Sequence, residues 1–255
     1  MTRWALLLEY DGGPFVGWQR QAGGLSVQEV LETAAARLNH GMPVASIVAG
    51  RTDAGVHAAA QVAQLDLPEA IPAAKVRDAL NFHMKPHPVV VLRAASPPIG
   101  WNARFSATGR AYRYSILNRR ARPALRAGRV WHVHGELDDA AMHRAAQALL
   151  GRHDFTSFRA AACQANSPLR TLDRLDVRRV GETVEVVAEA RSFLHHQVRN
   201  MVGTLKLVGE GSWPGDRVAA VLAARDRTAA GPTAPACGLC LTGVRYAADP
   251  FAPAM

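Results

Sequence analysis

Cysteine is scarce in this chain of 255 residues, which has only Cys163, Cys237 and Cys240. Three cysteines give no disulfide framework. Cys237 and Cys240 have C-x-x-C spacing, but no second pair of cysteines completes a zinc site. We therefore interpret this pair as two small buried hydrophobic side chains beside a C-terminal strand, and we assign it no chemical role.

Long apolar runs are absent as well. No stretch approaches the ~20 apolar residues that a membrane helix needs. The N-terminal residues 1–4 lead directly into a strand-like segment with Glu9 close behind, without the apolar core and small-residue cleavage site of a signal peptide. We therefore expect a cytoplasmic protein that contacts no membrane.

Several catalytic and cofactor-binding motifs are also missing. The sequence has no G-x-S-x-G motif and no cysteine in a nucleophile context, which argues against Ser/His/Asp hydrolysis. It has no phosphate-binding P-loop and no G-x-G-x-x-G after a strand, which argues against a nucleotide cofactor. His195 and His196 are adjacent, so on a helix they point about 100° apart and do not share a metal-binding face. We expect neither a metal nor a cofactor.

Positive charge, by contrast, is abundant. The net charge is +9, the isoelectric point is near 10.3, and the basic residues are almost all arginines, with lysine only at positions 75, 85 and 206. A protein with this net positive charge has an electrostatic field that attracts polyanions, so nucleic acid is the first partner to consider. Because part of the excess reflects a bias toward alanine and arginine, the positions of the arginines matter more than their number.

The hydrophobic pattern predicts an α+β protein in two similar halves, 1–105 and 106–255, with mainly antiparallel sheets. Strand-like segments have hairpin-like neighbours rather than regular crossovers, which disfavours a doubly wound parallel sheet. The strand at 58–67 mixes Gln61 and Gln64 with apolar residues, as a half-exposed strand does. Predicted strands are 3–10, 43–49, 58–67, 88–94, 110–117 and 239–246, with a hairpin over 170–191 turning at Gly181-Glu182. Predicted helices run from a Ser26–Glu29 capping box to about 40, and over 72–80, 138–150, 195–209 and 215–224.

Two segments of the second half carry candidate RNA-binding chemistry. In a strand at 110–117, Tyr112 and Tyr114 share one face and Arg113 takes the other. Tyrosine bordered by arginines is suited to stacking a base and holding its phosphates, although we expect one of the two tyrosines to be a core residue. Arg199 lies beside an apolar helix stripe, where an arginine either meets an anion or extends to solvent, and the residues leave both open.

A further candidate segment lies in the first half. It is the turn Gly50–Gly55, which contains Arg51 and Asp53 and precedes a strand. Taken alone, it reads as a structural Asx-type turn with a solvated Arg51. In an RNA-binding chain without a metal or cofactor motif, however, a carboxylate there has a second use. It can act as a nucleophile or as a general base on a base or sugar.

Longer motifs resemble the tRNA pseudouridine synthase A family. They run in order along the chain to residue 246, and their length makes chance an inadequate explanation. The motifs are EYDGGPFVGWQRQ (9–21), SVQEVLE (26–32), GRTDAGVHA (50–58), RFSATGRAYRY (104–114), DFTSFR (154–159), FLHHQVRNMVG (193–203) and AARDRT (223–228). One departure is NFHMKP at 81–86, where the family usually has an Asn-x-x-Leu-Pro run.

The resemblance implies a cofactor-free isomerisation with Asp53 as the catalytic aspartate. Asp53 attacks a uridine at ribose carbon 1′ or at uracil carbon 6; the glycosidic bond breaks, and the uracil turns and rejoins through its carbon 5. Arg199 is the implied charge partner that keeps the carboxylate ionised. Arg51 displaces the target base and takes its place in the stack. Tyr112 stacks on the flipped uracil and helps to remove the carbon-5 proton, which leaves Tyr114 as the core residue.

The resemblance also implies a partner and an assembly. The family modifies uridines 38, 39 and 40 in the anticodon stem-loop, and it acts as a homodimer in which one tRNA contacts both subunits. Its two α+β halves join their antiparallel sheets around a central cleft. Arg20, Arg110 and Arg113 are our candidates for further RNA contacts. The alternatives are a non-catalytic tRNA-binding protein or RNA chaperone on the same scaffold and, less favoured, a metal-dependent hydrolase.

Overall fold

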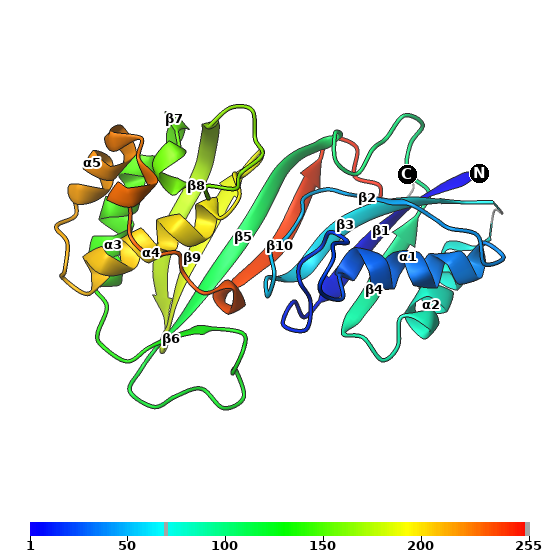
Figure 1. Cartoon of the computed structure of the whole chain (residues 1–255), viewed down its shortest axis with the longest axis horizontal. Helices are drawn as coiled ribbons and strands as arrows, with labels where there is room; N and C mark the ends of the chain where they lie inside the picture. The colour runs from blue at the N-terminus through cyan, green and yellow to red at the C-terminus, as the bar shows by residue number, and fades with distance from the viewer. Residues whose placement is uncertain (69–70, 253–255) are drawn as a thin grey trace. The chain divides into compact units, whose positions relative to one another are not determined.

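A computed structural model describes residues 1–68 and 71–252 of the chain (Figure 1). The chain forms two compact units. The first contains residues 1–110 together with the described residues from Leu241 onward, and the second contains residues 111–240. The sequence-based boundary at 105/106 thus lies close to the division at 110/111, whereas the C-terminal strand is grouped with the first unit rather than the second. No helix among the described residues is long and apolar enough to cross a membrane.

The first unit is built on an antiparallel sheet whose strand order is β4-β1-β3-β10. β1 pairs antiparallel with both β3 and β4, with Leu6 opposite Ala63 and Ala94, and the short β2 pairs with β3. The helices α1 and α2 accompany this sheet (Figure 1). The elements are β1 (Thr2–Tyr10), α1 (Val27–Leu38), β2 (Ser46–Val48), β3 (His57–Leu67), α2 (Ala73–His83), β4 (Val89–Ala95) and β10 (Leu239–Tyr246).

Local sequence signals explain where α1 begins and which face it buries. Ser26 is the N-cap, and its hydroxyl accepts a hydrogen bond from the Glu29 amide at 3.1 Å, as the capping box predicted. The helix buries a single apolar stripe, as helical periodicity requires. The buried residues are Val27, Val30, Leu31, Ala34 and Ala35.

β3 differs from its sequence-based description as a half-exposed strand. It lies between β1 and β10, and both of its glutamines are buried, Gln61 at 0% and Gln64 at 2% exposure. Each amide is satisfied by a backbone partner distant in the sequence: Gln61 Nε2 donates to Gly50 O at 2.8 Å, and Gln64 Oε1 accepts from Ala103 N at 2.7 Å. Buried polar side chains are tolerated when they are hydrogen-bonded in this way.

The second unit has the strand order β5-β9-β8-β7, with β6 parallel to β5. The β8–β9 hairpin turns at Gly181-Glu182 as predicted, since Val180 pairs with Thr183. The three-residue β6 and four-residue β7 were not predicted, and α3 ends earlier than expected, in a short 3₁₀ turn. The elements are β5 (Ala107–Asn118), β6 (Trp131–Val133), α3 (Asp139–Ala146), β7 (Gly151–Asp154), β8 (Leu169–Val180), β9 (Thr183–Ala190), α4 (Gln197–Gly209) and α5 (Arg217–Ala224).

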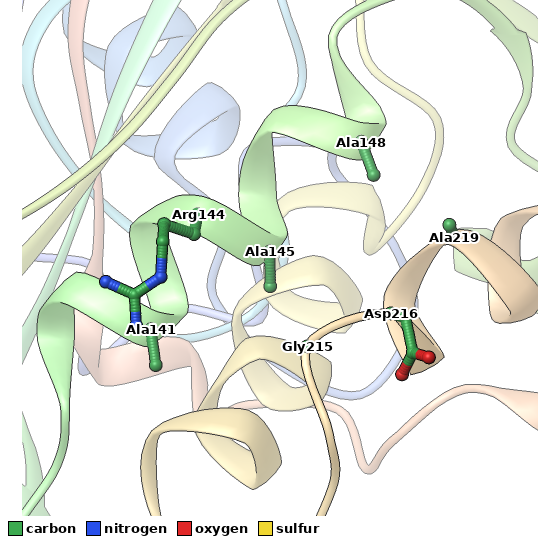
Figure 2. Close-up of a pocket in the computed structure, with 7 residues that line it drawn as sticks. All are labelled: Ala141, Arg144, Ala145, Ala148, Gly215, Asp216 and Ala219. Carbon is green, nitrogen blue, oxygen red and sulfur yellow. The ribbon is translucent and has the colours of Figure 1, made fainter.

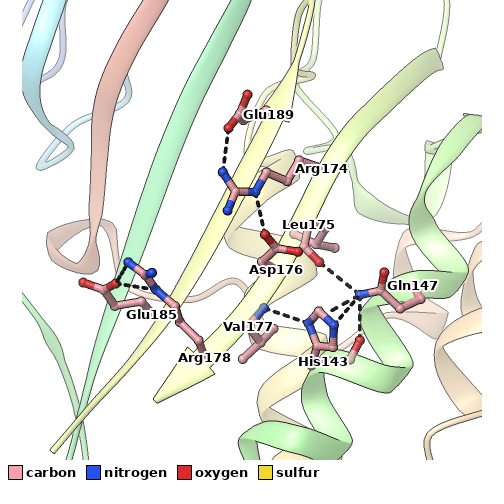
Figure 3. Close-up of polar contacts among 9 residues, drawn as sticks. All are labelled: His143, Gln147, Arg174, Leu175, Asp176, Val177, Arg178, Glu185 and Glu189. Atoms are coloured by element: carbon pink, nitrogen blue, oxygen red, sulfur yellow. Dashed lines mark hydrogen bonds and ion pairs between the residues drawn. The ribbon is translucent and has the colours of Figure 1, made fainter. Parts of the chain in front are cut away.

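Polar contacts attach α3 to the sheet of the second unit (Figure 3). The Val177 amide donates to His143 Nδ1 at 3.2 Å, and Gln147 Nε2 donates to Leu175 O at 3.3 Å. The first bond joins α3 to β8, and the second joins the 3₁₀ turn that follows α3 to the same strand. The whole molecule is therefore a mixed α+β protein with mostly antiparallel strand pairing, in agreement with the sequence-based fold class.

Candidate functional site

The turn that carries Asp53 joins β2 to β3 in the first unit. The Val56 amide donates to Asp53 O at 3.1 Å and closes the turn, and Gly55 adopts φ +76°. Asp53 is half-buried, while Arg51 is exposed. The turn thus presents a carboxylate and a guanidinium two residues apart, and only the carboxylate is partly withdrawn from solvent.

The segment after β1 packs its backbone directly against this turn. Trp18 N donates to Thr52 O at 3.0 Å, and Gly17 forms an isolated antiparallel bridge with Asp53. A Cβ atom at Gly17 would lie 2.8 Å from Thr52 O, and one at Gly12 would lie 2.0 Å from Val56 O. Gly17 also has φ +113°, which favours glycine. These two glycines permit the close approach that fixes the turn from one side.

A buried polar network fixes the turn from within the sheet. The Tyr10 hydroxyl lies 2.8 Å from Thr52 Oγ1, and Gln61 Nε2 donates to Gly50 O at 2.8 Å and to the Tyr10 hydroxyl at 3.3 Å. Tyr10, Thr52 and Gln61 are 3%, 7% and 0% exposed. Because an unpaired buried polar group costs about 1–3 kcal/mol, each bond strongly disfavours displacement of the turn.

Arg110 completes this support, although the sequence suggested it as an RNA contact. Its guanidinium is 8% exposed and donates to Ala49 O at 2.6 Å, to Arg104 O at 3.0 Å and to Ala107 O at 3.3 Å. A buried arginine that bonds to three carbonyls is a structural group. Arg110 therefore holds the residue that precedes the Gly50–Gly55 turn, and its burial argues against a contact with a phosphate.

The tyrosine strand of the second unit separates its two aromatic residues. Tyr114 is fully buried, and its hydroxyl donates to Pro235 O at 2.8 Å; burial raises the pKa of Tyr114 far above its usual value. Tyr114 is therefore the core residue, as expected. Tyr112 is 8% exposed, and its ring meets Phe193 edge to face at 5.3 Å between centroids. Tyr112 is therefore packed against a second aromatic ring.

Arg199 lies half-buried on α4 and has a backbone partner that the sequence did not reveal. Its Nε donates to Ala234 O at 2.8 Å, and the Ala234 amide donates back to Arg199 O at 3.2 Å. The two bonds clamp the segment around Ala234 to α4. One N–H group of the guanidinium is thereby oriented by the fold beside the apolar stripe of α4.

The remaining candidate arginines are exposed and face carboxylates at long range. Arg20 lies 3.9 Å from Glu29 and 3.6 Å from Glu32, and Arg113 lies 3.9 Å from Glu185. Such loose surface pairs contribute little to stability. Both side chains are therefore accessible, but their positive charge is partly balanced.

Cys237 supports the interpretation that the cysteine pair is not a reactive site. Burial raises the pKa of the Cys237 thiol, and the Sγ atom donates to Val130 O at 3.5 Å. The thiolate, not the thiol, is the nucleophile and the metal ligand. A raised pKa keeps this sulfur protonated and favours a packing role.

One pocket of the second unit is lined by none of the predicted site residues (Figure 2). It has a volume of about 410 Å³ and lies between α3 and the N-terminal part of α5. Its wall consists mainly of alanine methyl groups, with one arginine and one aspartate at the edge. The lining residues are Ala141, Arg144, Ala145, Ala148, Gly215, Asp216 and Ala219. This composition offers no pair of groups suited to acid–base or nucleophilic chemistry.

Comparison with known proteins identifies the family of the chain. The family model described as tRNA pseudouridine synthase matches residues 7–106 and 145–247, which include Asp53 and Arg199 but not Tyr112. The chain is 73% identical to a tRNA pseudouridine synthase A of Acidiphilium cryptum, over 98% of this chain and 99% of the relative. It is 64% identical to that of Rhodospirillum centenum, over 96% and 100%, and 63% identical to that of Paramagnetospirillum magneticum, over 98% and 97%. The chain belongs to the tRNA pseudouridine synthase family.

Proposed function

We propose that this protein isomerises uridine to pseudouridine in tRNA and that Asp53 is the attacking group. Family membership and the names of the relatives support the reaction. The observation that carries the assignment of Asp53 is the support around its turn. Three separate contacts, from Arg110, Gln61 and Tyr10, hold the backbone and side chains of residues 49–52 immediately before Asp53.

The reaction conserves every atom except for one exchanged proton. The bond between ribose carbon 1′ and uracil nitrogen 1 breaks, the uracil turns, and its carbon 5 bonds to carbon 1′. The proton on carbon 5 leaves and nitrogen 1 gains one. Attack by Asp53 at carbon 1′ or at carbon 6 begins this sequence, and either route needs an ionised carboxylate held in a fixed direction.

Arg51 and Tyr112 are proposed to act on the target base, and Arg199 on Asp53. The target uridine must leave its helical stack, at a cost of a few kcal/mol. Arg51, exposed on the turn, takes the vacated place in the stack. Tyr112 stacks on the flipped uracil and assists removal of the carbon-5 proton. Arg199, whose Nε donates to Ala234 O, is the proposed charge partner of Asp53.

The substrate positions and assembly that we propose follow the family. The uridines are those at positions 38, 39 and 40 of the anticodon stem-loop, and one tRNA contacts both subunits of a homodimer. Arg20 and Arg113, both exposed, contact RNA phosphates. Arg110 is omitted from the RNA contacts because it is buried and both of its terminal nitrogens donate to backbone carbonyls, those of Ala49, Arg104 and Ala107.

Release of tritium from transcript tRNA that carries 5-tritiated uridine tests this function. The protein should release tritium from tRNAs with uridine at 38, 39 or 40 and not from a matched transcript with cytidine at all three. Asp53→Ala should abolish release and leave tRNA binding nearly unchanged, because it removes a negative charge rather than a phosphate contact. Salt-sensitive binding without any release by the wild type would contradict the enzyme and support a non-catalytic tRNA-binding protein.

A further inference from the structure

The segment between β5 and β6 concentrates the positive charge of the chain. Its eleven residues, 119–129, contain five arginines and no acidic residue, against a net charge of +9 for all 255 residues. We call this segment the arginine loop. More than half of the excess charge therefore lies in one irregular stretch of the second unit, at Arg119, Arg120, Arg122, Arg126 and Arg129.

Two arginines on β8 of the same unit are paired with carboxylates (Figure 3). On β8, Arg174 is 2.5 Å from Asp176 and 3.1 Å from Glu189, and Arg178 is 2.8 Å from Glu185. The arginine loop is different. Within residues 1–68 and 71–252, neither Arg120 nor Arg122 has a carboxylate oxygen within 4.0 Å.

The loop is nevertheless held at two points. Arg119 Nη1 is 2.7 Å from Glu182 Oε2, and Arg126 Nη1 donates to the buried Thr183 Oγ1 at 2.7 Å. Both partners belong to the tip of the β8–β9 hairpin. Two arginines thus anchor the loop, and Arg120 and Arg122, which lie between the anchors, are exposed. Such an arrangement lowers the ordering cost of binding because much of the loop is already in place.

The chemistry of the loop fits a phosphate backbone better than a protein surface. The guanidinium group forms two parallel hydrogen bonds to a phosphate. Protein interfaces instead need an apolar core with few charges, and the only large apolar side chain within the loop is Leu125. The loop also lies outside both segments matched by the family model.

We propose that the arginine loop is an additional binding surface for the RNA backbone and that Arg120 and Arg122 contact phosphates. The proposal rests on the function proposed above, which identifies the RNA as tRNA. It concerns the affinity for tRNA and not the chemical step. The loop contributes affinity without sequence preference, because it contacts phosphates and not base edges.

The test compares two double variants that each remove two positive charges from the same unit. One is Arg120→Gln with Arg122→Gln in the loop, and the control is Arg174→Gln with Arg178→Gln on β8. Both are made in the Asp53→Ala background, so that the affinity for unmodified transcript tRNA is measured without turnover. Fluorescence anisotropy at several salt concentrations gives the dissociation constant and its salt dependence.

The loop variant should bind about tenfold more weakly at low salt. Its slope of log affinity against log salt should fall by about 2, one unit for each lost phosphate contact. The control should change affinity less than threefold with the same slope as the parent. Equal behaviour of the two variants would overturn the proposal, and so would a change in the sedimentation of the RNA-free protein in the loop variant alone, which would identify a protein interface. Because no turnover is measured, failure of the isomerase activity leaves this result interpretable.

Discussion

The Gly50–Gly55 turn and the arginine loop are both irregular segments next to short strands, since the turn follows β2 and the loop precedes β6. They differ in whether their polar groups are bonded within the protein or exposed to solvent. The turn is surrounded by buried partners, and Arg110, Gln61 and Tyr10 bond to it or to the residue before it. The arginine loop is anchored at two points and exposes the charges between them. The first arrangement fixes an atom for chemistry, and the second presents charge for binding. Each can be broken separately.

The largest effect is expected at Asp53 itself. Asp53→Asn keeps the size of the side chain and removes its nucleophilic oxygen, so tritium release should fall about 1000-fold or more. The affinity for tRNA should change less than threefold, because the turn is held by other residues. Single-turnover release and anisotropy binding on the same preparation check both statements. An Asp53→Asn variant with a tenth of wild-type activity would contradict the role of this carboxylate.

Arg110→Met should give the largest loss of stability. The substitution leaves three carbonyls without their donor, including Ala49 O before the turn, and should lower the free energy of unfolding by about 2–4 kcal/mol. Urea denaturation measures the change. Arg113→Met, on the exposed side of the same strand, is the control and should cost less than about 1 kcal/mol. Equal costs for the two variants would contradict the structural role of Arg110.

Gln61→Leu tests whether the buried network positions the turn or merely stabilises the sheet. Gln64→Leu is a matched control on the same strand, because Gln64 is equally buried but bonds to Ala103 N instead of the turn. Both variants should lose about 1–3 kcal/mol of unfolding free energy. Only Gln61→Leu should lower kcat, by about tenfold or more, with KM nearly constant. If both variants reduce kcat equally, the network has no special relation to Asp53.

The smallest effect is expected where charge is exposed and paired. Arg178→Ala removes an ion pair with Glu185, but the arginine side chain is 62% exposed. The unfolding free energy should therefore change by about 0.5 kcal/mol or less. A loss above 2 kcal/mol in urea denaturation would mean that the surface of β8 contributes to stability as the buried turn does.

The sequence predicted elements whose signals are local. The hairpin turn at Gly181-Glu182 and the strand over 239–246 were confirmed because turn residues and apolar runs mark them directly. β6 and β7 were missed because three or four residues are too short to show a period. The end of α3 was misplaced for a related reason, since its apolar pattern continues into the following 3₁₀ turn.

The supports of the candidate site were invisible for a different reason. Gln61 and Arg110 look like solvated residues because their partners, Gly50 and Ala49, lie 11 and 61 residues away in the chain. Only the folded arrangement reveals that they bond to the turn. The candidate residues themselves came from motif resemblance, and Asp53, Tyr112 and Arg199 stay predictions until their variants are assayed.

The close approach at Gly12 and Gly17 has a consequence for sequence variation. Gly12 and Gly17 must both remain without a side chain, because a Cβ atom would collide with the carbonyl of Val56 at the first and with that of Thr52 at the second. An insertion or deletion between Gly12 and Gly17 would move one of these glycines away from the carbonyl that it approaches. Gly13, between them, is less restricted, since a Cβ there meets only the side chain of Asp11, at 3.2 Å. Insertions and deletions should therefore be excluded between these glycines, whereas a substitution at Gly13 should be tolerated better than one at the buried Phe15.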